Sequence, residues 1–213
     1  MLYVPHEKQA VVFIDGQNLF NAAKRSFGYK FPNYDVAVLA EKVVTANGWR
    51  LAETRFYTGL PDATADPAKH AFWSAKTAAM KRQGLVAFTR PLRSRTVQTT
   101  DAAGQPKTET VWVEKGIDVR IAVDIISLAF RRVFDVAVVF SQDQDLSEVA
   151  HEIREIAAAQ GRWIKMASAY PVGPSCSNIR GINGTDWIRI DRALYDTCID
   201  ATDYRPRSGS GSP

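Results

Sequence analysis

Short runs of apolar residues constrain the fold of this chain more than any other feature of its sequence. Residues 9–14 (QAVVFI) and 136–140 (VAVVF) have the length and apolar content of strands that are buried on both faces. Segments in which apolar residues recur at helical spacing lie between such runs. Because strands alternate with helices, the sequence predicts an α/β fold with a mainly parallel central sheet, flanked by helices on both faces.

The same patterns place the other elements. Further strands are expected at 49–58, 85–89, 162–167 and 187–190, and helices at 18–27, 35–46, 68–83, 117–130 and 146–160. Thr- and Val-rich arms on either side of a polar turn predict a β-hairpin insertion at about 91–114. One domain is expected over residues 1–200, followed by a flexible, Gly- and Ser-rich tail at 201–213.

Composition and charge exclude several classes of protein. Hydrophobic residues make up 46% and charged residues 23% of the chain, which excludes wholesale disorder and a coiled coil. No stretch approaches 18 uncharged apolar residues, so neither a transmembrane helix nor a membrane partner is expected. Two cysteines without metal-ligand spacing indicate reduced thiols and a cytoplasmic protein. The net charge of +4 permits a nucleic-acid partner without requiring one.

Acidic residues follow two of the expected core strands. Asp15 comes directly after the first apolar run, and Asp143 and Asp145 follow the run at 136–140. In parallel sheets, ligands bind beyond the carboxyl ends of the strands, where the strand order reverses. Helix capping is the alternative for each of these residues, and Asp145 with Glu148 matches the spacing of a capping box. One carboxylate suffices for a cap, so the second of the pair is left unexplained by capping.

Two further acids lie on the expected helix at 117–130. Asp118 falls in register with an apolar row, where a carboxylate is unfavourable unless it is paired or bound to a cation. Its alternative role is that of an acid in the first helical turn, where the helix dipole favours negative charge. Asp124 lies on the polar stripe four residues after Arg120, and that spacing favours a surface salt bridge.

If these carboxylates converge, their mutual repulsion favours the binding of divalent cations or the uptake of protons. All the candidate ligands are oxygen atoms, without His or Cys, so Mg²⁺ or Mn²⁺ is expected rather than Zn²⁺. Two such ions can activate a water and stabilise the leaving oxygen of a phosphodiester. The convergence itself is a prediction that only a structure can test.

Three motifs carry a resemblance to a known family: residues 12–19 (VFIDGQNL), 114–124 (EKGIDVRIAVD) and 139–146 (VFSQDQDL). In order and spacing they resemble the NYN domains, which are PIN-like ribonucleases, and most closely the bacterial LabA-like (DUF88) branch. The similarity extends over roughly residues 9–190 and implies a PIN-like fold. The family's usual Ser-Gly-Asp-x-Asp motif has Gln142 here in place of Gly, which affects the expected turn but leaves both carboxylates in place.

The resemblance also implies roles for individual residues. Metal binding and catalysis would fall to four carboxylates, which are Asp15, Asp118, Asp143 and Asp145. Asn18 would orient a ligand or water beside Asp15. Asp124 matches a further acid that is frequent in the family, in contrast to the salt bridge that its position on the helix favours.

Basic residues gather in the expected hairpin insertion, next to the motif that contains Asp118. Cations at Arg93, Arg95, Lys107 and Lys115 could hold phosphates, while Tyr57 or Trp112 stacks on an unpaired base. An ordinary solvated hairpin with a basic face explains the same residues equally well.

The sequence thus predicts a divalent-metal-dependent ribonuclease, expected to be endonucleolytic, that acts on single-stranded or structured RNA, with transfer RNA among the candidates. A catalytically inactive or regulatory module that binds RNA or protein is the alternative. A phosphatase with Asp15 as nucleophile is less favoured, because Gln17 stands where a second acid is usual. Since PIN-like domains often pair, a homodimer is a further expectation.

Overall fold

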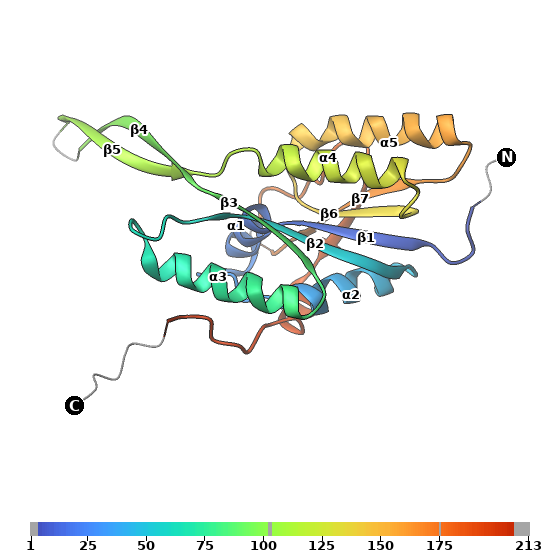
Figure 1. The fold of residues 1–213 in the computed structure, drawn as a ribbon, viewed down its shortest axis with the longest axis horizontal. Coiled ribbons are helices and arrows are strands. Elements are labelled where there is room, and N and C mark those ends of the chain that lie inside the picture. Colours follow the sequence, from blue (N-terminus) through green and yellow to red (C-terminus); the bar gives the residue numbers. More distant parts are fainter. Residues whose placement is uncertain (1–3, 102–103, 175, 207–213) are drawn as a thin grey trace.

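The computed structural model describes residues 4–101, 104–174 and 176–206. Six strands form one parallel sheet in the order β3-β2-β1-β6-β7-β8, and β4 and β5 form a separate antiparallel pair (Figure 1). The strands of the sheet are β1 (Gln9–Asp15), β2 (Arg50–Leu60), β3 (Val86–Pro91), β6 (Val136–Phe140), β7 (Lys165–Pro171) and β8 (Asp186–Ile190). The helices are α1 (Gly16–Phe27), α2 (Val36–Ala46), α3 (Pro67–Arg82), α4 (Ile117–Phe130), α5 (Ser147–Gln160) and α6 (Arg192–Asp196), with a short 3-10 helix, η1 (Gln144–Leu146). The α/β fold expected from the sequence is confirmed.

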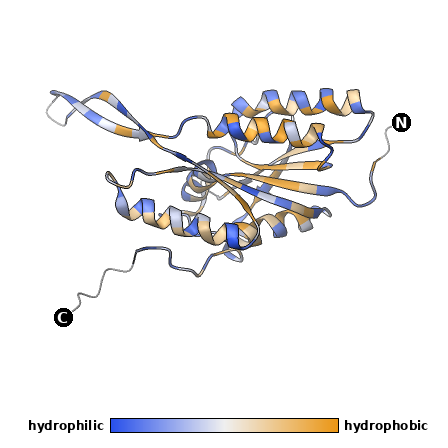
Figure 2. Ribbon diagram, in the orientation of Figure 1, coloured by the Kyte–Doolittle hydropathy of each residue, from blue (hydrophilic) through white to orange (hydrophobic). Residues whose placement is uncertain are grey.

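Helices cover both faces of the sheet. The alternation of side chains along β1 sends Val12 and Ile14 into a core with α1, α2 and α3, and Val11 and Phe13 into a core with α4 and α5. Figures 1 and 2 show α4 and α5 side by side on one face of the sheet and α2 and α3 on the opposite face. Because both faces of β1 are buried, its sequence is a continuous apolar run rather than an alternating one.

The last part of the sheet differs in detail from the prediction. β7 begins at Lys165 rather than at Arg162. The guanidinium of Arg162 donates to the carbonyl oxygens of Phe134 and Ala129, at 2.9 and 3.0 Å, and this contact belongs to a connection rather than a strand. The short helix α6 has no counterpart among the expected elements. Across the residues described, no helix is both long and apolar enough to cross a membrane.

The predicted hairpin insertion is confirmed as a two-stranded arm. It consists of β4 (Arg93–Thr100) and β5 (Pro106–Val113), and residues 102–103 of the expected turn lie outside the described residues. In Figure 1 the arm projects from the end of the sheet at which β1 terminates. Its position therefore places it beside the carboxyl edge, where ligands of parallel sheets bind.

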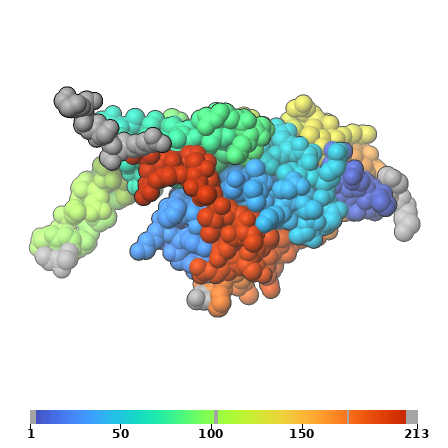
Figure 3. All heavy atoms as spheres, turned by 90° about the horizontal axis from the view of Figure 1, so that it is seen from below, coloured from blue at the N-terminus to red at the C-terminus, as the bar shows by residue number. Residues whose placement is uncertain are grey.

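The described part of the expected tail, residues 201–206, lies against the helical layer. The ammonium of the buried Lys76 is 2.9 Å from Asp200 and lies over the ring of Tyr204, at 4.8 Å from its centroid. Figure 3 shows this C-terminal segment in red against the rest of the molecule. Residues 207–213, the remainder of the expected tail, lie outside the described residues.

Candidate metal centre

The strand order fixes where a ligand site is expected. The chain proceeds from β1 to β2 and β3 on one side, and later fills the other side with β6, β7 and β8. The order therefore reverses between β1 and β6, which pair directly. Asp15 is the last residue of β1, and Asp143 lies three residues beyond the end of β6. Both acids thus stand at the crevice in which parallel α/β sheets bind ligands.

A pocket of about 380 Å³ opens at this crevice and brings three of the predicted carboxylates together. They are Asp15 from β1, Asp118 from the first turn of α4, and Asp143 from the segment after β6. A fourth carboxylate, Glu114, lines the same pocket. The described lining residues are Asp15, Gln17, Asn18, Asn21, Glu114, Lys115, Gly116, Ile117, Asp118 and Asp143. Four acids and one lysine leave this lining with an excess of negative charge.

Asp15 both caps a helix and lines the pocket. Its Oδ1 accepts a hydrogen bond of 2.9 Å from the backbone N–H of Asn18, so it is the N-cap of α1, as the alternative explanation of this residue proposed. Burial above all, and also the negative charges of Asp143 and Asp118, raise the pKa of Asp15 to about 6, against the lowering effect of this hydrogen bond. One carboxylate therefore has a structural and an electrostatic role at once.

Glu114 was not among the predicted site residues. Burial, followed by the charge of Asp15, raises its pKa to about 7, although the backbone N–H of Gly59 donates to its Oε2. It immediately precedes Lys115 and Gly116. Gly116 is the N-cap residue of α4, and its φ of +75° lies in the left-handed region, which favours glycine. The signal that could have revealed Glu114 is its place at the start of the motif that contains Asp118.

Asn18 ties together the two loops that carry the acids. Its Oδ1 accepts a hydrogen bond of 3.1 Å from the backbone N–H of Gln142. Gln142 itself adopts no left-handed conformation, since Arg132 is the one non-glycine residue with positive φ in the described part of the chain. Its side-chain amide donates to the carbonyl oxygens of Asn178 and Arg180, at 3.2 and 2.9 Å. The residue that replaces the family's Gly therefore anchors the segment before β8, and its backbone conformation does not require a glycine.

Asp143 and Asp145 have different surroundings. Asp143 lines the pocket, and its Oδ1 accepts from the backbone N–H of Asp145 at 3.1 Å, which makes it the cap of η1. Asp145 is exposed and does not line the pocket. The structure thus brings one member of this pair to the other acids, and leaves the role of Asp145 as a ligand a prediction.

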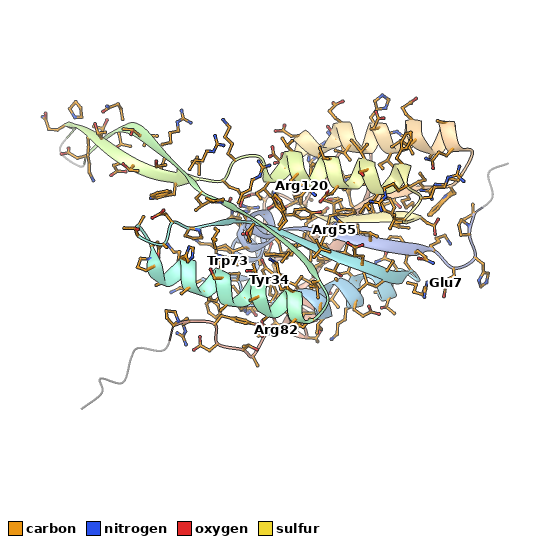
Figure 4. All side chains as sticks on the ribbon, viewed as in Figure 1. Glu7, Tyr34, Arg55, Trp73, Arg82 and Arg120 are labelled. Carbon is orange, nitrogen blue, oxygen red and sulfur yellow. The ribbon has the colours of Figure 1, made fainter. Side chains whose placement is uncertain are left out.

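Asp124 lies apart from the pocket and has three partners of its own. Its carboxylate is 3.3 Å from Arg55 on β2 and 2.9 Å from Arg120 on α4, and the hydroxyl of Tyr57 donates to it at 2.8 Å. Figure 4 labels both arginines, one on each of these elements. The salt bridge with Arg120 agrees with the helical spacing, but the carboxylate is buried rather than on the surface. We therefore leave Asp124 out of the candidate metal centre.

Comparison with known proteins assigns the family. A model of the NYN domain family matches residues 9–165, which is more than half of the chain. The chain belongs to the NYN domain family. Its fold is consequently of the PIN-like, nuclease type. The narrower assignment to the LabA-like branch stays a prediction.

Solved structures agree with the fold. A crystal structure of a protein of unknown function from Vibrio parahaemolyticus is similar at a TM-score of 0.51 and 15% identity, over 90% of this chain and 98% of that one. A ribokinase from Giardia lamblia reaches a TM-score of 0.36 at 9% identity, over 81% of this chain and 53% of that one, a likeness on which no argument rests. No match was found among curated proteins.

The predicted cations of this NYN domain are exposed, and one of them lines the pocket. Lys115 belongs to the lining, whereas Arg93, Arg95 and Lys107 lie on the hairpin arm. Arg90, just before the arm, reaches back to the pocket: a Cβ on Gly116 would lie 2.5 Å from its guanidinium. A basic rim therefore runs from the pocket toward the arm.

Only one of the two predicted stacking aromatics is accessible. Tyr57 has no exposed surface, so its predicted stacking on a base is wrong. Its hydroxyl is held by Asp124 instead. Trp112 is 42% exposed and lies opposite Ser94 in the hairpin register. Arg93 and Arg95 alternate with Ser94 along β4, so the indole and these two arginines lie on opposite faces of the arm.

The pocket of the NYN domain fits a hard divalent cation by its donor atoms and charge. Its four carboxylates present the oxygen donors that Mg²⁺ and Mn²⁺ prefer, and its one lysine offsets only part of their negative charge. Across the described residues, however, no three acidic, His or Cys side chains stand close enough to hold a metal ion together. Mg²⁺ commonly keeps several waters and takes only one or two carboxylates, so the present residues suit such a mode of binding.

Proposed function

We propose that this NYN domain is a divalent-metal-dependent ribonuclease that hydrolyses phosphodiester bonds within RNA chains. The observation that carries the proposal is the convergence of carboxylates from separate segments at the point where the strand order reverses. Their charge is not balanced within the pocket, since Lys115 is the one basic side chain among its described lining residues. Such an excess favours cations, and phosphoryl transfer is the chemistry that hard cations serve at such sites.

In this proposal, Asp15, Asp118 and Asp143 hold Mg²⁺ or Mn²⁺, and Glu114 adds a fourth carboxylate. When bound, the metal would act as a Lewis acid that activates water and stabilises charge on the leaving oxygen. Because the metal competes with protons for Asp15 and Glu114, binding should strengthen as the pH rises through the range about 6–7.

Other residues would position the substrate. Asn18 keeps the loop after β6 in register with α1 through its bond to Gln142, and so fixes the separation of Asp15 and Asp143. Lys115 lines the acidic pocket, where its ammonium can meet a phosphate. Arg93 and Arg95 would hold the backbone of a longer RNA, single-stranded or structured, with transfer RNA as one candidate. The two free cysteines are consistent with action in the cytoplasm.

The experiment is metal-dependent cleavage of labelled RNA by the Asp143→Asn variant. Asn keeps the side-chain oxygen that caps η1, so the fold should survive while a negative ligand is lost. We expect a loss of more than about 100-fold in Mn²⁺-dependent cleavage, because metal catalysis contributes several kcal/mol. Full activity of this variant would remove Asp143 from the mechanism.

Two matched variants sharpen the result. Glu148→Gln removes an exposed acid on the first turn of α5 and should leave cleavage unchanged. Asp145→Asn tests the one predicted ligand that the pocket does not include. If Asp145→Asn is as inactive as Asp143→Asn, the metal centre extends beyond the pocket. A parallel assay with DNA of the same sequence decides the type of nucleic acid.

A second candidate function follows from the absence, in the described chain, of three ligands in position to hold a metal. On this alternative the domain is an inactive or regulatory module that binds RNA or protein. Calorimetric titration with Mg²⁺ and Mn²⁺ separates the two functions. Binding that disappears in Asp143→Asn supports the nuclease, whereas no binding at millimolar metal favours the module.

A further inference from the structure

An apolar stripe lies on the outward side of α4. Val119, Val123 and Phe130 are 60%, 53% and 69% exposed, and the partly buried Ile126 completes the row. Their spacing of four, three and four residues is that of a helix seam that packs against another helix. Figure 2 shows α4 as a largely orange helix at the surface of its layer. Large exposed apolar rows of this kind mark interaction surfaces.

The two flanks of this α4 stripe carry opposite charges. On the side of α5, Glu148, Glu152 and Glu155 form an exposed row with no ion-pair partner in the described part of the chain. On the other side lies Arg120, which pairs with Asp124 one turn further along α4 and lies over the ring of Phe88 on β3. Arg131 follows Arg120 by 11 residues, about three helical turns, so it extends the same flank.

We infer that this stripe is the interface of a homodimer in which the two copies of α4 run parallel about a two-fold axis. A rotation about an axis along the helices places the acidic flank of each copy opposite the basic flank of the other. An antiparallel pair would instead oppose the glutamates of α5 to their own equivalents. In coiled coils, ion pairs between oppositely charged residues that flank the apolar seam set the orientation of the helices in the same way.

The direction of the elements gives this arrangement a consequence. α4 and α5 both return from the carboxyl edge of the sheet, and the side chain of Gln160 donates to the carbonyl of Phe130 where the two helices end. A parallel dimer therefore brings both pockets and both hairpin arms to one end of the assembly. The stripe spans roughly 17 Å on one helix, which suits a small interface and a dissociable dimer.

The first test is the mass of the full chain across a concentration series from about 1 to 300 µM, by light scattering or sedimentation. We expect a monomer–dimer equilibrium that Val123→Glu shifts to monomer by at least tenfold in Kd. Val38→Glu, the same exchange at a 37% exposed site in the first turn of α2, is the control and should leave the Kd unchanged. A wild-type chain that stays monomeric throughout, or Val123→Glu that dimerises normally, overturns the inference.

Two further variants keep the test decisive if Val123→Glu fails to fold. Glu152→Lys with Glu155→Lys changes exposed side chains only and should weaken the dimer through repulsion from the partner's basic flank. Val119→Cys, in a Cys176→Ser background, should form a disulfide-linked dimer under mild oxidation, because equivalent residues face each other in a parallel pair. If the chain dimerises but this cysteine does not cross-link, the parallel arrangement is wrong. Since cleavage is not measured, the outcome is independent of the proposed function.

Discussion

Helix α4 carries two aspartates six residues apart that the fold treats in opposite ways. Asp124 is buried, and Arg55, Arg120 and Tyr57 all contact it. Asp118 faces a pocket that contains three other carboxylates and a single lysine among its described lining residues. The negative charge is neutralised at one end of the helix and left uncompensated at the other.

This difference separates charge that stabilises the fold from charge that is available for a ligand. A buried carboxylate with two guanidinium partners is unfavourable to remove, because the partners would then be left without it. A cluster of acids without cations has the reverse effect, since each negative charge disfavours its neighbours. Burial, and after it the charges of neighbouring carboxylates, raise the pKa of Asp15 to about 6 and that of Glu114 to about 7, so the ionised form of both groups is disfavoured in the folded chain. Such local destabilisation is commonly found at functional sites.

The largest difference in stability is expected between two matched substitutions on α4. Asp124→Asn should lower the free energy of unfolding by about 2–3 kcal/mol, because it removes the charge that faces Arg55 and Arg120. The ion pair of Arg55 with Glu53, at 2.6 Å, limits the loss. Asp118→Asn should change the stability by no more than about 0.5 kcal/mol, because the half-buried carboxylate of Asp118 has no ion-pair partner in the described part of the chain. Chemical denaturation of both variants measures the two values.

Activity should follow the opposite order. Asp118→Asn should abolish metal-dependent cleavage, whereas Asp124→Asn should retain it in the fraction of molecules that are folded. Equal losses of stability in the two variants would contradict the distinction between the two ends of α4. Loss of cleavage in folded Asp124→Asn would instead return Asp124 to the metal centre, as the family resemblance implies.

The stability of the folded chain should depend on pH and on divalent metal through Asp15 and Glu114. Because the folded-state pKa values of Asp15 and Glu114 lie above the ordinary values of 3.8 and 4.5, the folded chain binds more protons than the unfolded chain between about pH 4 and 7. Their contribution to stability is therefore present at low pH and lost as the pH rises through that window, by up to about 3 kcal/mol for each group. Unfolding curves from pH 4 to 8 in the absence of divalent metal measure this loss.

Variants and metal test its origin. Asp15→Asn preserves the cap of α1, since Asn is an equally good N-cap, and together with Glu114→Gln it should flatten the pH dependence. Addition of Mn²⁺ at pH 7.5 should raise the Tm of the wild type and leave that of the double variant unchanged. A wild-type Tm that is insensitive to both pH and Mn²⁺ would show that Asp15 and Glu114 neither have raised pKa values in the folded chain nor bind the metal.

The sequence predicts the positions of those acids that directly follow a buried strand. Asp15 and Asp143 were identified because each follows a buried strand, and parallel pairing of β1 with β6 brings those ends together. Asp118 was identified because a carboxylate interrupted an apolar helical row. These three inferences need only local periodicity and one topological rule, and all three residues line the pocket, whereas Asp145, which the same rule selects, does not.

What the sequence could not supply were contacts between distant residues. The partners of Asp124 on β2 lie 67 and 69 positions away, so local spacing pointed only to Arg120. Tyr57 looked available for stacking because nothing local shows that α4 covers it. Glu114 is not predicted because its hydrogen bond with the backbone N–H of Gly59 joins residues 55 positions apart. Long-range packing decides which acids are neutralised and which are not.

The hairpin arm extends the comparison to positive charge and gives the smallest expected effect. Lys107 is already paired with Glu109 at 2.7 Å, whereas Arg93 and Arg95 have no carboxylate partner in the described part of the chain. The double variant Arg93→Ala/Arg95→Ala should raise KM for RNA by about tenfold with kcat unchanged, and reduce the salt slope of binding by about one per lost phosphate contact. Lys107→Ala should change neither quantity measurably, because its charge is neutralised within the arm. Cleavage kinetics and binding at several salt concentrations distinguish the three proteins. If Lys107→Ala weakens binding as much as the double variant does, pairing within the fold does not determine which charges are available to RNA.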